Sequence, residues 1–375
     1  MKKWLSLLLL SAVAILLAAC NTDKEEETND AGAEDSTNEK LEVYTTVYPL
    51  QYFAERIGGD YVHAQTVYPP GANEHTFEPT QKDMMAVADA DFFFYVGQGL
   101  EGFVENAKKT LEGQHVKMVA TADVLTEEQF NLSTGHVHAE GDDHDHSATE
   151  EEHNHEHDAT EEEHNHEHDA TEEEHNHKHD ATEEEHNHDH DATEEEHNHD
   201  HHIDTHVWLS PILSKDLASV IKDELIAALP EQEELFTKNY DALVADFEQL
   251  NKDFEAMATE TTSKTFFVSH AAFGYIAGHY GFNQVPVAGI NSQDEPSQKE
   301  LANLVELAKK ENIQYIFFEQ NVSSKLTEVI QKEVGAKSLI LHNLGVLTQE
   351  DIDNGEDYFT LMRKNIEQLQ TALSQ

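Results

Sequence analysis

An eleven-residue unit, repeated in the middle of the chain, sets the strongest limit on what these 375 residues can fold into. The unit ATEEEHNHEHD starts at Ala148, Ala159, Ala170, Ala181 and Ala192, and it varies only at its last few positions. An eleven-residue period can specify a right-handed helical supercoil, but only if apolar residues recur along it. Here the single apolar residue of each unit is an alanine, so burial cannot offset the entropy of ordering the chain. We therefore expect residues 137–202 to form a disordered loop.

Histidine distinguishes this segment from an ordinary acidic spacer. Each repeat carries an H-x-H pattern flanked by carboxylates, and neutral imidazole is the commonest metal ligand. A solvated acidic spacer is the alternative, but glutamate and aspartate alone would serve that purpose. The pattern therefore favours low-affinity collection of a borderline metal such as zinc, by His153, His155, His157, His164, His166, His168, His175, His177, His179, His186, His188, His190, His197, His199, His201 and His202.

The start of the chain has the composition of an export signal. Lys2 and Lys3 precede a short apolar run and small residues, which predicts a secretory signal peptide over residues 1–19. The run is too short to predict a membrane span. A buried helix is the alternative, but the extreme N-terminal position and the flanking lysines disfavour it.

A single cysteine follows this signal. The stretch from Leu17 to Cys20 resembles the bacterial lipobox, which implies that Cys20 is lipidated and becomes the first residue of the mature protein. Because Cys20 is the only cysteine, an intramolecular disulfide is excluded. Residues 20–40 are small, polar and acidic, which predicts a disordered tether behind the lipid anchor.

The formal net charge of −53 is unevenly distributed, and the five repeats alone contribute −22 of it. No basic stripe is present that could release counterions from nucleic acid, so nucleic acid is excluded as a partner. A cation is the partner that this charge favours.

Outside the signal, the tether and the repeats, the chain is long enough for two lobes, each with its own core. In the first part, strands are predicted at 41–47, 61–67 and 90–96, and helices at 48–57 and 80–88. Strands that alternate with helices predict a parallel sheet covered on both faces.

His75 lies in the Pro- and Gly-containing loop of residues 68–79, after the second predicted strand. Parallel sheets bind ligands beyond the carboxyl ends of their strands. A lone loop histidine is usually a surface residue, but Glu74 supplies a second donor beside this one. His63 and His115 have no such neighbour, and we interpret both as ordinary surface or strand residues.

Two helices are predicted between the lobes. The first begins at Pro211 and ends near Ala228. In the second, residues 230–260, apolar residues recur at spacings of three and four, which predicts one helix about 40 Å long. A coiled-coil partner is the alternative, but the chain returns to alternating strands and helices immediately afterwards. We therefore favour a rigid helix that links an N-terminal lobe, residues 41–229, to a C-terminal lobe, residues 261–375.

The C-terminal lobe repeats the pattern of the first. Strands are predicted at 265–269, 285–289, 313–318 and 338–341, and helices at 297–310, 323–334 and 358–373. His270 follows the first of these strands, so it can face the same cleft as His75. The sequence therefore predicts an α/β fold of two lobes with parallel-type sheets, joined by a long rigid helix.

Five stretches, in this order along the chain, resemble one known family. They are YPPGANEHTFEP (68–79), THVWLSP (205–211), VSHAAFGY (268–275), DEPS (294–297) and IFFE (316–319). The chain resembles the zinc- and manganese-binding lipoproteins of bacterial metal ABC importers. The similarity covers residues 41–375 except the repeats, whose position between the first two ligand motifs fits the zinc branch.

The resemblance implies two α/β lobes joined by a long helix, with a metal site in the cleft between them. Carried over position by position, it implies His75, His206 and His270 as metal ligands. Many members of the family place a carboxylate shortly after the last strand, where this chain has Gly345.

The fourth ligand therefore has three candidates. The resemblance implies that zinc-binding members without the late carboxylate use a glutamate just before the first histidine, or water. Glu74 stands in that place, and His342 is a further candidate.

The donor set favours one metal and one class of function. Three imidazoles and one oxygen suit tetrahedral zinc, whereas manganese favours more carboxylate oxygen. Neither an H-E-x-x-H motif nor a nucleophile–base pair stands out, so we do not expect an enzyme. We expect a monomeric, exported zinc-binding protein, anchored by lipid on the outer face of the cell membrane, that delivers Zn²⁺ to an ABC permease. The alternatives are a manganese or iron carrier, or a metal-buffering surface adhesin.

Overall fold

The computed structural model describes residues 40–134, 203–322 and 324–374. The predicted signal peptide, Cys20, the tether up to residue 39 and the repeat histidines lie outside the described residues. Within these three ranges, no helix has both the length and the apolar character needed to cross a membrane.

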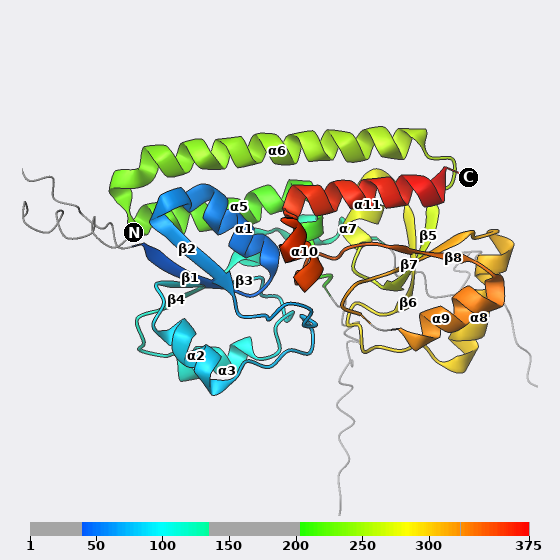
Figure 1. The fold of residues 1–375 in the computed structure, drawn as a ribbon, viewed down its shortest axis with the longest axis horizontal. Coiled ribbons are helices and arrows are strands. Elements are labelled where there is room, and N and C mark those ends of the chain that lie inside the picture. The colour runs from blue at the N-terminus through cyan, green and yellow to red at the C-terminus, as the bar shows by residue number, and fades with distance from the viewer. Residues whose placement is uncertain (1–39, 135–202, 323, 375) are drawn as a thin grey trace, which may run out of the picture. The chain divides into compact units, whose positions relative to one another are not determined.

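The first lobe is built on a four-stranded parallel sheet with the order β2-β1-β3-β4 (Figure 1). Three of its strands were predicted, and they are β1 (Leu41–Thr45), β2 (Val62–Thr66) and β3 (Phe92–Tyr95). β3, with the sequence FFFY, is buried throughout, as a central parallel strand should be. The unpredicted strand β4 (Lys117–Ala120) is a short edge strand with no fully buried residue, so its sequence lacks a long apolar run.

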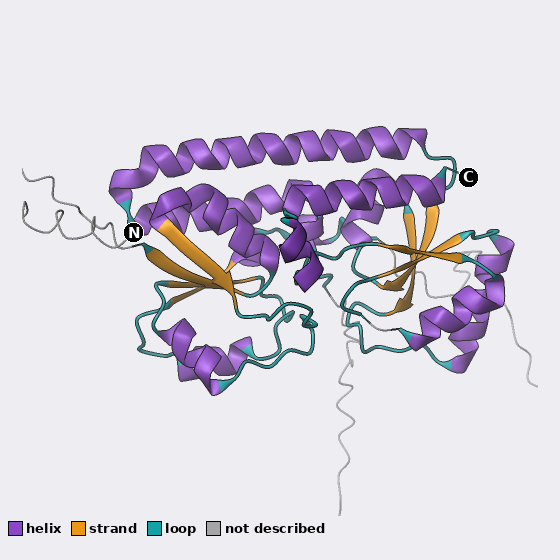
Figure 2. Ribbon diagram, viewed as in Figure 1, coloured by secondary structure: helices purple, strands orange, loops and turns teal. Residues whose placement is uncertain are grey.

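Helices cover both faces of this sheet (Figure 2). The predicted ones are α1 (Tyr48–Gly58) and α2 (Gln81–Ala88), and Thr80 caps α2 by accepting from the backbone N–H of Asp83. Shorter helical elements complete the described part of this lobe: η1 (Gly59–Tyr61), α3 (Val104–Thr110), η2 (Thr121–Val124) and α4 (Glu127–Phe130).

The second lobe repeats this topology with the order β6-β5-β7-β8, again with all strands parallel. Its strands are β5 (Thr265–His270), β6 (Asn283–Ala288), β7 (Tyr315–Phe318) and β8 (Lys337–Ile340). Its helices are α7 (Gly274–Tyr280), α8 (Gln298–Lys310), α9 (Lys325–Val334), α10 (Gln349–Asn354) and α11 (Tyr358–Leu373). The predicted repetition of architecture is therefore confirmed.

A long helix spans the two lobes. After η3 (Val207–Leu209), α5 (Pro211–Ala228) and η4 (Pro230–Gln232), the 28 residues of α6 (Glu233–Glu260) run as one helix about 42 Å long. It packs against α1 and α5 at one end and α11 at the other (Figure 1). The predicted linking helix is thus confirmed, and it packs on several helices rather than on one coiled-coil partner.

The expectation of a separate core for each lobe is wrong. One continuous apolar cluster extends from the first sheet through α1, α5, α6 and α11 to the second sheet, and a smaller one lies around β6, β7, α8 and α9. Phe53, Phe247 and Tyr358 meet in the shared layer with ring centroids 5.2–5.7 Å apart. The helices bury apolar faces against both lobes at once, so the two lobes share most of their core.

Candidate metal centre

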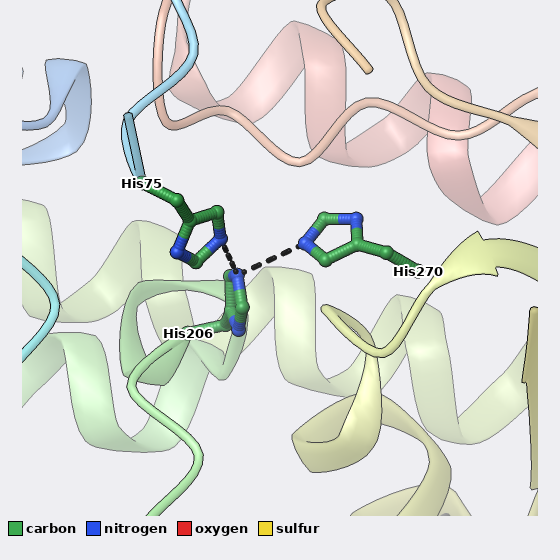
Figure 3. A group of neighbouring side chains, drawn as sticks. All are labelled: His75, His206 and His270. Atoms are coloured by element: carbon green, nitrogen blue, oxygen red, sulfur yellow. Dashed lines mark hydrogen bonds between the residues drawn. The ribbon is translucent and has the colours of Figure 1, made fainter. Parts of the chain in front are cut away.

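Three histidines from distant parts of the chain meet where the lobes join (Figure 3). His75 comes from the loop after β2, His206 precedes η3, and His270 is the last residue of β5. The Nε2 atom of His206 lies 3.2 Å from Nε2 of His75 and 3.3 Å from Nε2 of His270. His206 and His270 are fully buried and His75 is partly exposed. The fold therefore gathers three imidazole nitrogens, with one side accessible through His75.

A buried aspartate orients His206. One carboxylate oxygen of Asp204, Oδ1, accepts both from Nδ1 of His206 at 2.9 Å and from its backbone N–H at 3.0 Å. Because Nδ1 carries the proton toward this carboxylate, the lone pair of His206 is on Nε2, which faces the other two rings. Carboxylate partners of this kind fix the tautomer of metal-binding histidines.

His270 is held in the same way by Glu319. The Oε1 atom of Glu319 accepts from Nδ1 of His270 at 2.7 Å, from its backbone N–H at 3.2 Å, and from the hydroxyl of Ser269 at 2.6 Å. Burial alone would raise the pKa of Glu319, but His270 and these donors outweigh it and hold the pKa below its usual range. Burial alone would lower the pKa of His270, but the charge of Glu319 outweighs it and raises that pKa.

His75 is prepared for metal binding by its surroundings. Burial, together with the two neighbouring imidazoles, lowers the pKa of His75 to about 2. The ring is therefore neutral at neutral pH, which is the form that binds a metal. Its backbone N–H donates to Oδ1 of Asn73 at 3.0 Å, which fixes the loop beside the ring.

The spacing of the nitrogens matches a small tetrahedral metal. With metal–nitrogen bonds of about 2.0–2.1 Å, the ligands of a tetrahedral zinc ion lie roughly 3.3–3.4 Å apart. The two Nε2 separations of 3.2 and 3.3 Å are close to that edge length. Converging lone pairs repel each other unless a proton or a cation lies between them, so metal binding here should displace protons.

Glu74 is buried beside this group but is not one of the three residues whose ligand atoms lie within 4.8 Å of one another. Its Oε1 accepts from the side-chain amide of Asn343 at 2.8 Å. Its Oε2 makes no hydrogen bond within the described part of the chain, and burial raises the pKa of this carboxyl group. Burying a carboxylate oxygen without a partner costs free energy unless a cation or a proton binds to it.

The space that Glu74 occupies depends on Gly345. A Cβ atom added at Gly345 would lie only 2.9 Å from both Cδ and Oε1 of Glu74. The carboxyl group of Glu74 therefore fills the volume that a side chain at position 345 would need. Glu74 can adopt this position only because residue 345 is a glycine without a side chain.

Three supporting residues were not identified from sequence. Asn343 donates to Oε1 of Glu74 at 2.8 Å and to Oε2 of Glu319 at 3.1 Å, so one amide joins a carboxylate of each lobe. Asp204 and Glu319 both lie next to or within the motifs already quoted, and those positions were the available signal. Asn343 had no comparable signal, since its role depends on packing between residues 269 positions apart.

His342 is not a free metal ligand in this structure. Its Nδ1 accepts from the backbone N–H of Leu344 at 2.9 Å, and its Nε2 lies 3.1 Å from Oδ2 of Asp351. Both ring nitrogens are thus engaged, and we discard His342 as a fourth-ligand candidate. His63 and His115 lie at the surface next to Glu42 and Asp91, as expected of ordinary residues.

The fold and the cluster together define a class: two-lobed α/β solute-binding proteins with a histidine-lined centre between the lobes. The family model for ZnuA, the periplasmic zinc-uptake complex component A, matches residues 43–372. The chain therefore belongs to this family, which is one of transport components, and the resemblance read from the five motifs is confirmed.

Individual relatives agree. The chain is 32% identical over 376 residues to the zinc-binding lipoprotein AdcA of Streptococcus pneumoniae. That alignment covers 100% of this chain and 62% of the length of AdcA. It is also 32% identical over 372 residues to the high-affinity zinc uptake system protein ZnuA of Bacillus subtilis, covering 99% and 98% of the two chains. The solved Zn(II)-bound ZnuA-like domain of S. pneumoniae AdcA aligns with a TM-score of 0.62 and 28% identity, over 90% of this chain and 100% of that one.

Proposed function

We propose that this protein is the exported, high-affinity zinc-binding component of an ABC importer, which captures Zn²⁺ and delivers it to a membrane permease. The observation that carries the proposal is the convergence of three imidazole Nε2 atoms at the spacing of tetrahedral zinc ligands. The relatives named as zinc-binding and zinc-uptake proteins support it. Zinc is the transported substrate, held by His75, His206 and His270.

Manganese or iron transport is the nearest alternative. A site of three imidazoles with at most one carboxylate favours zinc over manganese, both by donor type and by the Irving–Williams order. The deciding experiment is metal analysis of the purified full chain after equilibration with zinc and excess manganese. We expect one tightly held zinc ion per molecule besides weaker binding, and manganese retained against excess zinc would overturn the proposal.

Glu74 is the fourth ligand that we propose. We expect Glu74→Gln to weaken zinc binding about 10- to 100-fold, because the amide keeps the bond to Asn343 but loses the anionic oxygen. Chelator competition measures the affinity, and the visible spectrum of the Co²⁺-substituted protein reports the coordination number. The control is Glu105→Gln in α3, where the exposed carboxylate pairs with Lys108. An unchanged affinity in Glu74→Gln would leave water as the fourth ligand.

The repeat segment acts as a low-affinity zinc collector in this proposal. The described residues on its two sides are in contact, because the hydroxyl of Ser133 donates to Oδ2 of Asp204 at 2.6 Å. We therefore expect excision of residues 137–202, with a short Gly-Ser link, to leave the melting temperature and the tight site unchanged. Isothermal titration should show fewer zinc ions bound in total. Loss of cooperative unfolding would contradict the collector role and assign the segment to the fold.

The remaining assignments follow from the sequence pattern and the lipoprotein relative. We propose a signal peptide at 1–19, a lipid anchor on Cys20 at the outer face of the membrane, and a tether to residue 40. The N-terminal lobe, with the repeats inserted, is residues 41–229, the linking helix 230–260 and the C-terminal lobe 261–375. The protein acts as a monomer, with zinc and the permease as its partners.

A further inference from the structure

The short segment on the N-terminal side of the repeats lies against the opposite lobe. Leu132, Ser133 and Thr134, which we call the anchor segment, follow α4 of the first lobe but pack on α7 of the second. The backbone N–H of Thr134 donates to the carbonyl oxygen of Gly274 at 3.1 Å. The anchor segment therefore joins the two lobes, and its Ser133 contacts Asp204, the carboxylate partner of His206.

Two glycines on one face of α7 make this contact possible. Gly274 and Gly278 are four residues apart, so they lie one above the other on the helix. A Cβ atom on Gly278 would come 1.9 Å from the carbonyl oxygen of Leu132, and one on Gly274 would come 2.1 Å from Oγ of Ser133. Any side chain at position 278 would displace the backbone of the anchor segment.

The anchor segment reaches His206 through one carboxylate. Oδ2 of Asp204 accepts from Ser133, while Oδ1 accepts from Nδ1 and the backbone N–H of His206. The backbone oxygen of Asp204 also accepts from the hydroxyl of Tyr275 on α7, at 2.6 Å. Asp204 is only 4% exposed, so its orientation depends on these few donors.

We propose that Ser133 is a positioning residue for zinc binding, seated by Gly278, which sets the orientation of the His206 imidazole through Asp204. The inference rests on the proposed function, and it adds that the two flanks of the repeat segment form part of the support of the tight site. Without the Ser133 hydroxyl, the buried carboxylate of Asp204 loses its donor at Oδ2 and is held less firmly by the two donors of His206 at Oδ1. Because Asp204 orients the His206 imidazole, the ring is then oriented less rigidly and binds the metal less tightly.

The test compares zinc release from the full chain in Ser133→Ala, Ser133→Thr and Gly278→Ala. Ser133 does not contact the ligand His206 itself but the carboxylate of Asp204 that orients it. We therefore expect Ser133→Ala to release zinc only about three- to tenfold faster. Ser133→Thr keeps the hydroxyl and should release zinc at the wild-type rate. Gly278→Ala displaces the anchor segment and should release zinc at least as fast as Ser133→Ala. The controls are Ser338→Ala, on exposed β8, and Gly102→Ala, at a turn where an added Cβ meets nothing within 4 Å.

A metal-free measurement separates this inference from the proposed function. Hydrogen exchange on the zinc-free chain should be faster around residues 204–206 in Ser133→Ala, since the His206 amide is protected by Asp204. Unchanged exchange there, or equal zinc release from Ser133→Ala and wild type, would overturn the inference. So would a Ser133→Thr variant that behaves like alanine. If the wild-type chain binds no zinc tightly, the proposed function is overturned instead. The hydrogen-exchange comparison still tests the role of Ser133 in that case, because it is made without metal.

Discussion

Replacing His270 with alanine should abolish tight zinc binding, with an affinity loss on the order of 10³-fold, equivalent to about 4 kcal/mol. The variant removes one of the three converging nitrogens at a fully buried position. Chelator competition measures the loss directly. The same loss should appear as a missing thermal shift, because zinc at 100 times its dissociation constant stabilises the wild type by about 2.7 kcal/mol.

His270→Ala should also destabilise the metal-free protein. Glu319 is completely buried and loses the Nδ1–H donor of His270, and removing one partner of a buried pair of this kind costs about 3–5 kcal/mol. Melting curves with and without zinc separate the two effects. His115→Ala is the matched control, since His115 is exposed and likewise pairs with a carboxylate, that of Asp91. If His270→Ala kept zinc affinity within tenfold of wild type, the three-histidine centre would be wrong.

Glu319→Gln should weaken zinc binding about 10- to 100-fold and also destabilise the fold. The amide oxygen can keep the bonds from Ser269 and His270, but the NH₂ group then faces the amide donor of Asn343. The charge that holds the His270 tautomer is lost as well. Unfolding should become about 1–3 kcal/mol easier, because a buried donor is left without an acceptor.

Glu101→Gln is a closely matched control for this prediction. Glu101 is likewise buried at the end of a sheet, where it accepts from the Thr46 hydroxyl and from the backbone N–H groups of Val96 and Gly97. The glutamine should destabilise the fold by a similar amount, yet leave zinc affinity unchanged, since Glu101 contacts none of the three histidines. Equal losses of zinc affinity in both variants would mean that Glu319 acts only through general stability. Denaturant unfolding and chelator competition on the two proteins provide the comparison.

Much of the fold was predictable from local pattern. The strand Phe92–Tyr95 is a continuous apolar run and the long helix Glu233–Glu260 carries apolar periodicity, and both types were correct with ends within a few residues. The edge strand Lys117–Ala120 was missed, because its four residues show neither a long apolar run nor an alternation of buried and exposed positions. The shared core was also missed, since periodicity shows which face of a helix is apolar but not how many partners that face covers.

The sequence by itself determined which three histidines meet. His75 and His270 follow predicted strands of two separate sheets, beyond whose carboxyl ends ligands bind, and the family resemblance added His206 to them. Only the tertiary structure decided what supports them. Glu74 lies in space that Gly345 leaves open, Asn343 joins carboxylates of both lobes, and Ser133 reaches Asp204 across the repeats. These contacts join residues from 24 to 271 positions apart, so they arise from packing and leave no trace in local sequence spacing.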